Sequence, residues 1–147
     1  NSADTTTIQT LTSSREWLWV GGNHDPLPPA HLGGQGVREL ILEQLQLRHV
    51  ASGEVAGEVA GHLHPKASIK TRGRRMTRRC FVSDGVRLIL PAFGAYAGGL
   101  DVCNPAFAAT FPGPFMVYLL GRNSVHAFSS SRIVGASGEE GYFHRLG

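Results

Sequence analysis

Short apolar runs that end at glycine, proline or polar residues recur along most of the chain. The clearest runs are residues 17–20, 55–60, 67–71, 76–82, 86–90 and 115–120. Runs of this kind between turn-forming residues are typical of buried or half-buried strands. We therefore predict a strand-rich domain, with a hairpin that turns near Gly73 and a further strand at 124–128 that pairs with 115–120.

Other segments have weaker patterns. Residues 37–50 fit both a helical face and strand alternation, and we favour two strands with a turn near Glu43 and Gln44. Residues 1–14 are polar and predict a frayed helix or an extended lead-in. Stretches rich in glycine or proline predict loops or, at the end, a loose tail. These stretches are residues 21–36, 92–102 and 135–147.

The length and composition fit one domain. The chain has 147 residues, and its 19 glycines and 8 prolines indicate many tight turns. No apolar run approaches the roughly 18–20 residues needed to cross a bilayer, so no membrane partner is expected. Cys80 and Cys103 lack Cys-x-x-Cys spacing. We therefore expect reduced, partly buried thiols, no zinc–thiolate site and a cytoplasmic location.

The positive charge is concentrated in one segment. The net charge is only +3, but half of the 14 lysines and arginines lie between Glu58 and Asp84 with no acid among them. They are Lys66, Lys70, Arg72, Arg74, Arg75, Arg78 and Arg79. A solvated basic loop is the simpler interpretation. The alternative is a site for a phosphate-bearing partner, because lysine and arginine neutralise phosphates.

Two short histidine clusters carry the most informative chemistry. Gly22-Asn23-His24-Asp25 follows the run at 17–20, and Gly61-His62-Leu63-His64-Pro65 follows the run at 55–60. On extended backbone, two imidazoles one residue apart point to the same side. Imidazole and amide oxygen suit divalent manganese, iron, zinc or nickel. Together the clusters predict a site for one or two divalent cations, although a structural histidine pair would explain either cluster alone.

A centre of this kind is suited to phosphoester chemistry. Two metal ions roughly 3.5–4 Å apart clamp a phosphate and generate hydroxide for in-line attack on phosphorus. A histidine beside a ligating asparagine, as His24 stands beside Asn23, can give the leaving oxygen its proton. A hairpin would return the basic segment toward this centre.

The clusters resemble motifs of the calcineurin-like metallophosphoesterases. That superfamily carries, in order, Asp-x-His, Gly-Asp, Gly-Asn-His-Asp/Glu, an isolated histidine and Gly-His-x-His. The third and fifth motifs match the two clusters. His49, at the end of an apolar run, is the best match for the isolated histidine, ahead of His31 in its proline- and glycine-rich loop.

A closer resemblance is to the bacterial DNA-ligase-associated metallophosphoesterases, over about residues 15–105. It rests on the arginine-rich stretch and on Gly61–Ala67, Arg79–Phe81, Leu90–Tyr96 and Gly98–Asp101. This subfamily is thought to act as a phosphodiesterase or nuclease in DNA end processing, beside a ligase and a helicase. The resemblance therefore implies a DNA or other phosphodiester substrate and those two partners.

The resemblance also implies metal ligands. Asn23, His49 and His62 resemble the ligands of one metal ion, and His64 resembles a ligand of the other. The implied cofactor is a pair of divalent ions, with manganese as the first choice and iron, zinc or nickel as alternatives.

Two further roles follow from the same resemblance. His24 resembles the residue that binds phosphate and assists departure of the leaving group, and Asp25 resembles the partner that orients His24. The residues expected to hold a polyanion are Arg72, Arg74, Arg75, Arg78 and Arg79.

Two motifs of the family are absent. Asp-x-His and Gly-Asp do not occur, and Asp4, the only acid before Glu16, is preceded by alanine. We expect residues 1–147 to form a single metallophosphoesterase domain that is incomplete at its N-terminus. The implied fold is α/β: a strand-rich two-sheet sandwich flanked by helices, without its opening βαβ portion.

The expected function is metal-dependent hydrolysis of phosphodiester bonds, as a nuclease or phosphodiesterase in DNA repair. One alternative is a catalytically incomplete fragment that acts as a basic nucleic-acid-binding module. Another is a phosphomonoesterase on the same scaffold, because a fold does not determine its substrate.

Overall fold

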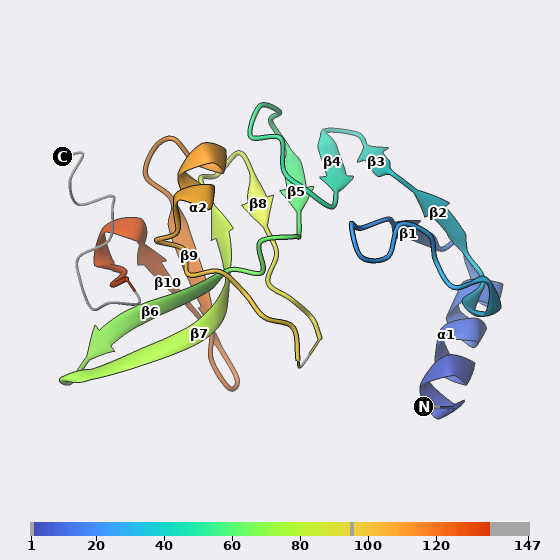
Figure 1. Cartoon of the computed structure of the whole chain (residues 1–147), viewed down its shortest axis with the longest axis horizontal. Coiled ribbons are helices and arrows are strands. Elements are labelled where there is room, and N and C mark those ends of the chain that lie inside the picture. The colour runs from blue at the N-terminus through green and yellow to red at the C-terminus, as the bar shows by residue number, and fades with distance from the viewer. Residues whose placement is uncertain (1, 95, 136–147) are drawn as a thin grey trace.

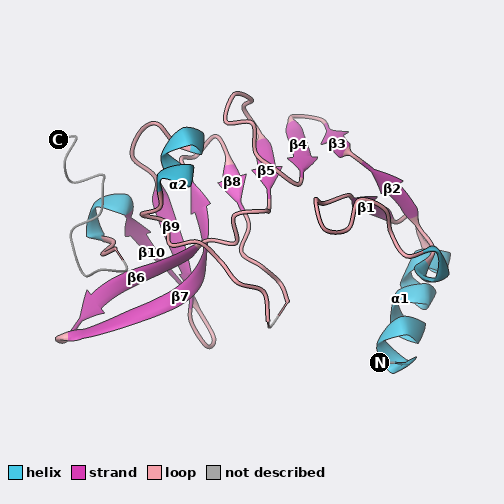
Figure 2. Ribbon diagram, viewed as in Figure 1, coloured by secondary structure: helices cyan, strands magenta, loops and turns pink. Residues whose placement is uncertain are grey.

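The protein is a strand-rich α/β structure with a mixed eight-stranded sheet, a small two-stranded sheet and two α-helices (Figures 1 and 2). The computed structural model describes residues 2–94 and 96–135. The expectation of a strand-rich α/β fold is confirmed at this level. Within the described residues, neither helix has the length and apolar character needed to cross a membrane.

The helices are α1 (Ser2–Ser14) and α2 (Pro105–Thr110), with 3₁₀ turns at Ala30–Leu32 and Ser130–Arg132. The strands are β1 (Leu18–Val20), β2 (Gln35–Val37), β3 (Glu39–Leu42), β4 (Leu45–Arg48), β5 (Glu58–Ala60), β6 (Lys66–Thr71), β7 (Arg74–Ser83), β8 (Leu88–Ile89), β9 (Met116–Leu120) and β10 (Val125–Ser129).

The large sheet has the strand order β10-β9-β7-β8-β5-β4-β3, and β6 pairs with β7 beside this path. Strand β5 pairs in parallel with both β4 and β8, whereas the remaining pairs of this sheet are antiparallel. The small sheet is the parallel pair β1–β2. Figure 1 shows α1 and the small sheet at one end of the molecule and the β6–β7 hairpin at the other.

The core lies where α2 packs against the centre of the large sheet. Phe107 and Phe111 of this region are fully buried together with Val82, Ile89 and Val117 from three strands. Burying a side chain of this size stabilises the fold by about 1.5–3 kcal/mol. The β3–β4 end is covered much less, and its apolar side chains stay largely exposed.

The hairpin predictions are confirmed. Residues 37–50 contain β3 and β4, which pair with Leu42 opposite Leu45, and Glu43 in the turn has a φ of 53°. The β6–β7 hairpin turns at Arg72 and Gly73, both with positive φ, and β9 pairs with β10.

Three expectations need correction or completion. Residues 21–36, predicted as a loop, contain the 3₁₀ turn at Ala30–Leu32 and most of β2. Strand β2 forms because the Gln35 amide donates to the Trp17 carbonyl and begins a parallel pair with β1. The run at 17–20 is only partly buried. The unpredicted helix α2 begins at Asn104, whose side chain accepts a hydrogen bond from the Ala106 amide.

The polar start of the chain forms α1, in agreement with the helical alternative for residues 1–14. Its threonine hydroxyls bond to carbonyls one turn earlier, for example from Thr6 to Ser2 and from Thr10 to Thr6. The tail predicted at 135–147 falls, apart from its first residue, outside the described residues.

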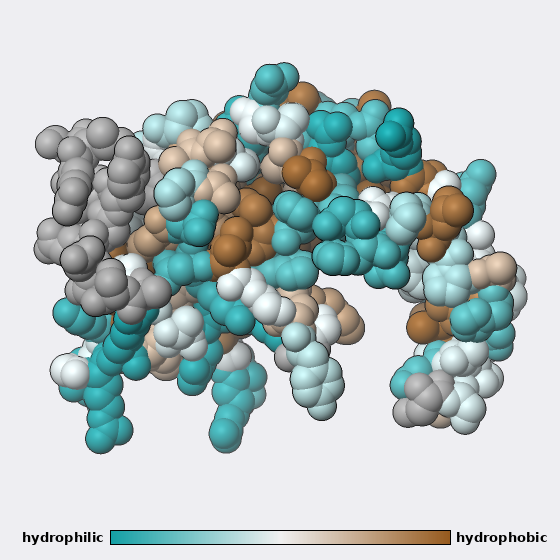
Figure 3. Space-filling view, viewed as in Figure 1, coloured by the Kyte–Doolittle hydropathy of each residue, from teal (hydrophilic) through white to brown (hydrophobic). Residues whose placement is uncertain are grey.

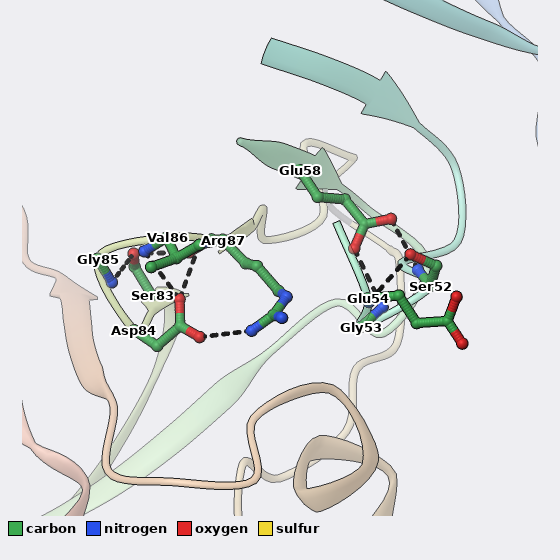
Figure 4. A network of polar contacts seen from close by, with 9 residues as sticks. All are labelled: Ser52, Gly53, Glu54, Glu58, Ser83, Asp84, Gly85, Val86 and Arg87. Carbon is green, nitrogen blue, oxygen red and sulfur yellow. Dashed lines mark hydrogen bonds and ion pairs between the residues drawn. The ribbon is translucent and has the colours of Figure 1, made fainter. Parts of the chain in front are cut away.

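A buried carboxylate holds the loop between β4 and β5 (Figure 4). Glu58, the first residue of β5, is 1% exposed. It accepts hydrogen bonds from the Ser52 amide (2.7 Å), the Gly53 amide (3.1 Å) and the Arg48 guanidinium (3.3 Å). Burial alone would raise the pKa of Glu58, but these donors outweigh it and the pKa is lowered.

A second network in Figure 4 closes the turn between β7 and β8. The Asp84 carboxylate accepts from the amides of Val86 and Arg87 and from the Arg87 guanidinium, the last at 2.8 Å. The Val86 carbonyl in turn accepts from the Gly57 amide. The two networks therefore fix β5 and β8 side by side in the middle of the sheet.

We predict that Glu58→Gln destabilises the protein by about 1–3 kcal/mol at pH 7, because a buried charged acceptor is replaced by an amide that cannot satisfy both backbone donors. Urea denaturation of the full chain measures this change. Glu54→Gln is the matched control, since Glu54 lies exposed in the same loop, and its effect should stay within about 0.5 kcal/mol.

The same pair of proteins tests the pKa of Glu58. Because that pKa is lowered from 4.5, the stability advantage of the wild type should be complete above pH 4.5 and disappear as the pH falls through the folded-state pKa. Equal effects of the two substitutions, or an advantage that does not change with acidification, would contradict the assignment.

Candidate metal centre

Three segments that follow strands form the candidate centre. His49 follows β4, His62 and His64 follow β5, and Asn23 lies shortly after β1. The parallel register places Arg48 opposite Ala60, and the Gly61 amide donates to the His49 carbonyl at 3.1 Å. The carboxyl ends of β4 and β5 therefore bring His49 and His62 to the same edge of the sheet.

The donor atoms of three predicted ligands converge. His49 Nε2 lies 2.6 Å from Asn23 Oδ1 and 3.2 Å from His62 Nδ1. The rings of His49 and His62 are 5.0 Å apart between centroids and meet edge to face at 72°. Both contacts are of hydrogen-bond length. Two ligands of one metal ion at 2.0–2.2 Å stand roughly 3–3.5 Å apart, so the His49–His62 spacing suits a shared ion, whereas the Asn23–His49 contact is shorter than that.

The remaining predicted residues surround the same cavity. It measures about 320 Å³ and is lined by Gly22, Asn23, His24, Asp25, His49, His62 and His64. We refer to this cavity as the histidine pocket. It gathers every residue that the sequence assigned to metal binding or catalysis, whereas His31 lies outside it on the 3₁₀ turn at Ala30–Leu32.

The backbone of the histidine pair is not extended, and the expectation of extended backbone was wrong. His62 and His64 both have left-handed conformations, with φ values of 62° and 47°. Such backbone costs of order 1–3 kcal/mol per non-glycine residue, and it occurs at tight turns and at functional sites. The Leu63 amide donates to the Gly61 carbonyl at 2.7 Å and closes this tight bend.

The glycine-rich loop, residues 92–102, supports the bend at His62 and His64 from outside. The Leu100 amide donates to the Leu63 carbonyl, and the Lys66 amide donates to the Leu100 carbonyl. A side chain at Gly99 would overlap the His64 carbonyl, so only glycine allows this close approach. These contacts hold His62 and His64 in conformations that the segment would not retain alone.

Gly22 has a direct part in the pocket. A Cβ atom at this position would lie 3.0 Å from both Cε1 and Nδ1 of His49. The bare backbone of Gly22 therefore makes room for the His49 ring beside Asn23. This contact gives a physical reason for glycine before Asn23.

His49 is biased toward its neutral form. Partial burial lowers its pKa from the usual 6.5, and the nearby imidazoles of His62, His64 and His24 lower it further. Metal ligation requires neutral imidazole, so this shift extends the pH range in which His49 can act as a ligand.

The pocket offers too few donors for two divalent ions. Within residues 2–94 and 96–135, no group of three or more histidine, cysteine, aspartate or glutamate side chains is disposed to hold a metal ion. The pocket reaches three donors because the Asn23 amide joins His49 and His62. For a second ion it offers His64, with the Asp25 carboxylate also in the lining.

The cysteines take no part in the pocket. Both are unpaired, Cys80 is buried and Cys103 is partly buried. Burial, chiefly, and the charge of Asp101 raise the pKa of each thiol to about 12, so both stay protonated at neutral pH.

None of the five arginines in the basic segment lines the histidine pocket. Arg72 and Arg74 lie at the turn of the β6–β7 hairpin, which points away from β4 and β5 in Figure 1. The expected return of the whole segment toward the metal ligands is therefore not observed. Arg79, at the base of the hairpin, donates to the carbonyls of Ala92 (3.1 Å) and Gly94 (2.7 Å) and anchors the glycine-rich loop.

Sequence reasoning missed the residues that support the pocket. Glu58 holds the loop that begins with His49, and Leu100 supports the histidine pair. The tetrapeptide Gly-Glu-Val-Ala occurs twice in tandem, at residues 53–56 and 57–60, and this repetition gave no sign that Glu58 is buried while Glu54 is exposed. The glycine pair at 98–99 was the one available signal of a close backbone approach.

Comparison with known proteins identified no relative: no family model matches the chain, and neither a curated protein nor a solved structure shows significant similarity.

We predict that the chain binds Mn²⁺ and that His49→Ala weakens this binding at least tenfold, because His49 touches both other donors. Isothermal titration calorimetry with MnCl₂ measures the affinity. Asn23→Ala should also weaken binding, whereas His31→Ala, which removes an imidazole outside the pocket, should change it less than twofold. Equal losses in the His31 and His49 variants would rule out this centre.

Proposed function

We propose that this chain is a calcineurin-like metallophosphoesterase that hydrolyses phosphodiester bonds, with nucleic acid as its substrate. The observation that carries the proposal is the convergence of Asn23, His49 and His62. His49 Nε2 lies 2.6 Å from Asn23 Oδ1 and 3.2 Å from His62 Nδ1. Three segments far apart in the sequence meet in the order and with the residue types that this family uses.

A divalent ion, manganese by preference, would be held by Asn23, His49 and His62 and would supply positive charge to polarise a phosphoryl oxygen. His24 lines the same cavity, where it can bind a phosphate oxygen and pass a proton to the leaving oxygen. In this proposal Asp25, the next residue in the chain, orients the His24 ring.

The proposal includes a finer description of the fold. We infer a two-sheet sandwich flanked by helices, of which this chain holds the strand-rich later part. The mixed large sheet, the separate β1–β2 pair and the exposed apolar side chains on β3 are consistent with that architecture. Ile41 of β3 is 65% exposed, as expected for a sheet end without its full cover.

The choice of nucleic acid rests on charge. One face of the β6–β7 hairpin carries Lys66 opposite Arg79 and Lys70 opposite Arg75. These cations form a ladder that starts two residues after His64. Such a ladder can follow a phosphate backbone as it leaves the pocket. A role in DNA repair beside a ligase and a helicase is part of the same proposal.

The first test is hydrolysis of bis-p-nitrophenyl phosphate with added Mn²⁺. We predict that His24→Ala lowers kcat by about 10²–10⁴, because proton transfer to the leaving group is lost. His62→Ala should remove activity together with Mn²⁺ binding, and His31→Ala should leave both unchanged. A wild-type rate no higher than that of the variants would identify a binding module instead of an enzyme, and equal turnover of p-nitrophenyl phosphate would favour a phosphomonoesterase.

The second test is the salt dependence of DNA binding. We predict that the logarithm of the affinity falls steeply with the logarithm of the salt concentration, because phosphate contacts release counterions. Replacing the five arginines of the basic segment by glutamine should flatten this slope. Fluorescence anisotropy with a labelled oligonucleotide measures both. Weak binding that is independent of salt from the outset would exclude nucleic acid as the substrate.

A further inference from the structure

We propose that a cleft between the β6–β7 and β9–β10 hairpins binds a phosphate attached to an aromatic ring, the chemistry of a nucleotide. We call it the hairpin cleft. It shares no lining residue with the histidine pocket, and its occupation requires no metal ion. The inference therefore goes beyond the proposed hydrolysis.

Unequal strand lengths create the cleft. Strand β7 has ten residues but pairs with β9 only from Cys80 to Ser83, so its outer half has β6 as its one neighbour. Strand β9 ends at Leu120, and the chain reverses where the Gly121 amide donates to the Ser124 carbonyl. The two hairpins diverge beyond this point (Figure 1) and leave a cavity of about 290 Å³.

The floor of the cleft is apolar. Ile69 of β6, Met76 of β7 and Phe128 of β10 line it, and Ile69 also belongs to the buried core. Ligand pockets in proteins usually measure about 300–1,000 Å³, so this cleft is at the small end of that range. Its size fits one ring system and one attached group.

The rim of the cleft carries the positive charges of Arg78 of β7 and Arg122 after β9. His126 of β10 lines it as well, and no aspartate or glutamate does. Arg78 and Arg122 are exposed and form no ion pair with a carboxylate within the described residues. Figure 3 shows hydrophilic side chains projecting over the ends of both hairpins.

The position of His126 is determined by its neighbours. Its Nε2 lies 2.9 Å from the Ser124 hydroxyl, and its ring rests on Gly121, where a Cβ atom would come within 3.2 Å of Nε2. Arg78 of β7 lines the same cleft as His126 and Gly121, just beyond the last β7–β9 pair, Cys80–Leu119.

A cationic rim above an apolar floor selects a ligand that carries both a negative charge and an apolar ring. Inorganic phosphate would use the rim alone, and a nucleoside would use the floor alone. A nucleotide uses both, with its phosphate at Arg78 and Arg122 and its base on the floor beside Phe128. A free nucleotide and one nucleotide of a strand share this chemistry.

The test is binding of AMP to the full chain in EDTA, followed by calorimetry and by ¹H–¹⁵N NMR. We expect AMP to bind at least tenfold more tightly than either inorganic phosphate or adenosine, with the largest shifts at Gly121 and His126. Arg78→Gln and Arg122→Gln should each weaken AMP binding about five- to tenfold. Arg38→Gln, which removes the same charge from an exposed position between β2 and β3, should change it less than twofold.

Several results would overturn the proposal. The first is that phosphate or adenosine binds as tightly as AMP. The second is that the Arg78 and Arg122 variants keep the Tm of the wild type and bind AMP as tightly as it does. The third is that the NMR shifts caused by AMP are confined to the histidine pocket. Competition with a short single-stranded oligonucleotide then shows whether the natural ligand is a free nucleotide or one nucleotide of a strand. Displacement of AMP by the oligonucleotide assigns the cleft to a strand, and simultaneous binding assigns it to a free nucleotide.

Discussion

The parallel pairing of β4 and β5 is the constraint on which the candidate centre depends. It sets Arg48 beside Ala60, so that the next residues of both strands, including His49 and His62, emerge at one edge of the sheet. Glu58 stabilises this arrangement from within, because it lies in β5 and accepts hydrogen bonds from the loop that His49 begins. Stability of the sheet and geometry of the pocket are therefore linked through one buried carboxylate.

The pocket combines this rigid base with strained backbone. His62 and His64 adopt left-handed conformations that the bracing contacts of Leu100 and the close approach at Gly99 maintain. Strain of this kind persists only where surrounding structure over-determines it, and here that structure is the glycine-rich loop. Arg79 anchors the start of the same loop, so a basic residue predicted to hold substrate has a structural role as well.

Local signals in the sequence predicted the fold best where the structure is itself local. The hairpin turn at Gly73 and the antiparallel strands around Glu43 follow from alternation and turn chemistry alone. Strand β2 was missed because Gln35–Val37 is ordered by a parallel partner distant in sequence. For the pocket, motif residues could be named, but the bend at His62 depends on contacts with residues 99–101, which no local pattern reveals.

The most direct test of the metal centre is a crystal structure of the chain with Mn²⁺, with the ion located by anomalous diffraction. The account predicts an anomalous peak within about 2.0–2.3 Å of Asn23 Oδ1, His49 Nε2 and His62 Nδ1, because the first and third of these atoms both lie close to His49 Nε2, at 2.6 and 3.2 Å. A peak elsewhere, or an empty histidine pocket at saturating Mn²⁺, would contradict it.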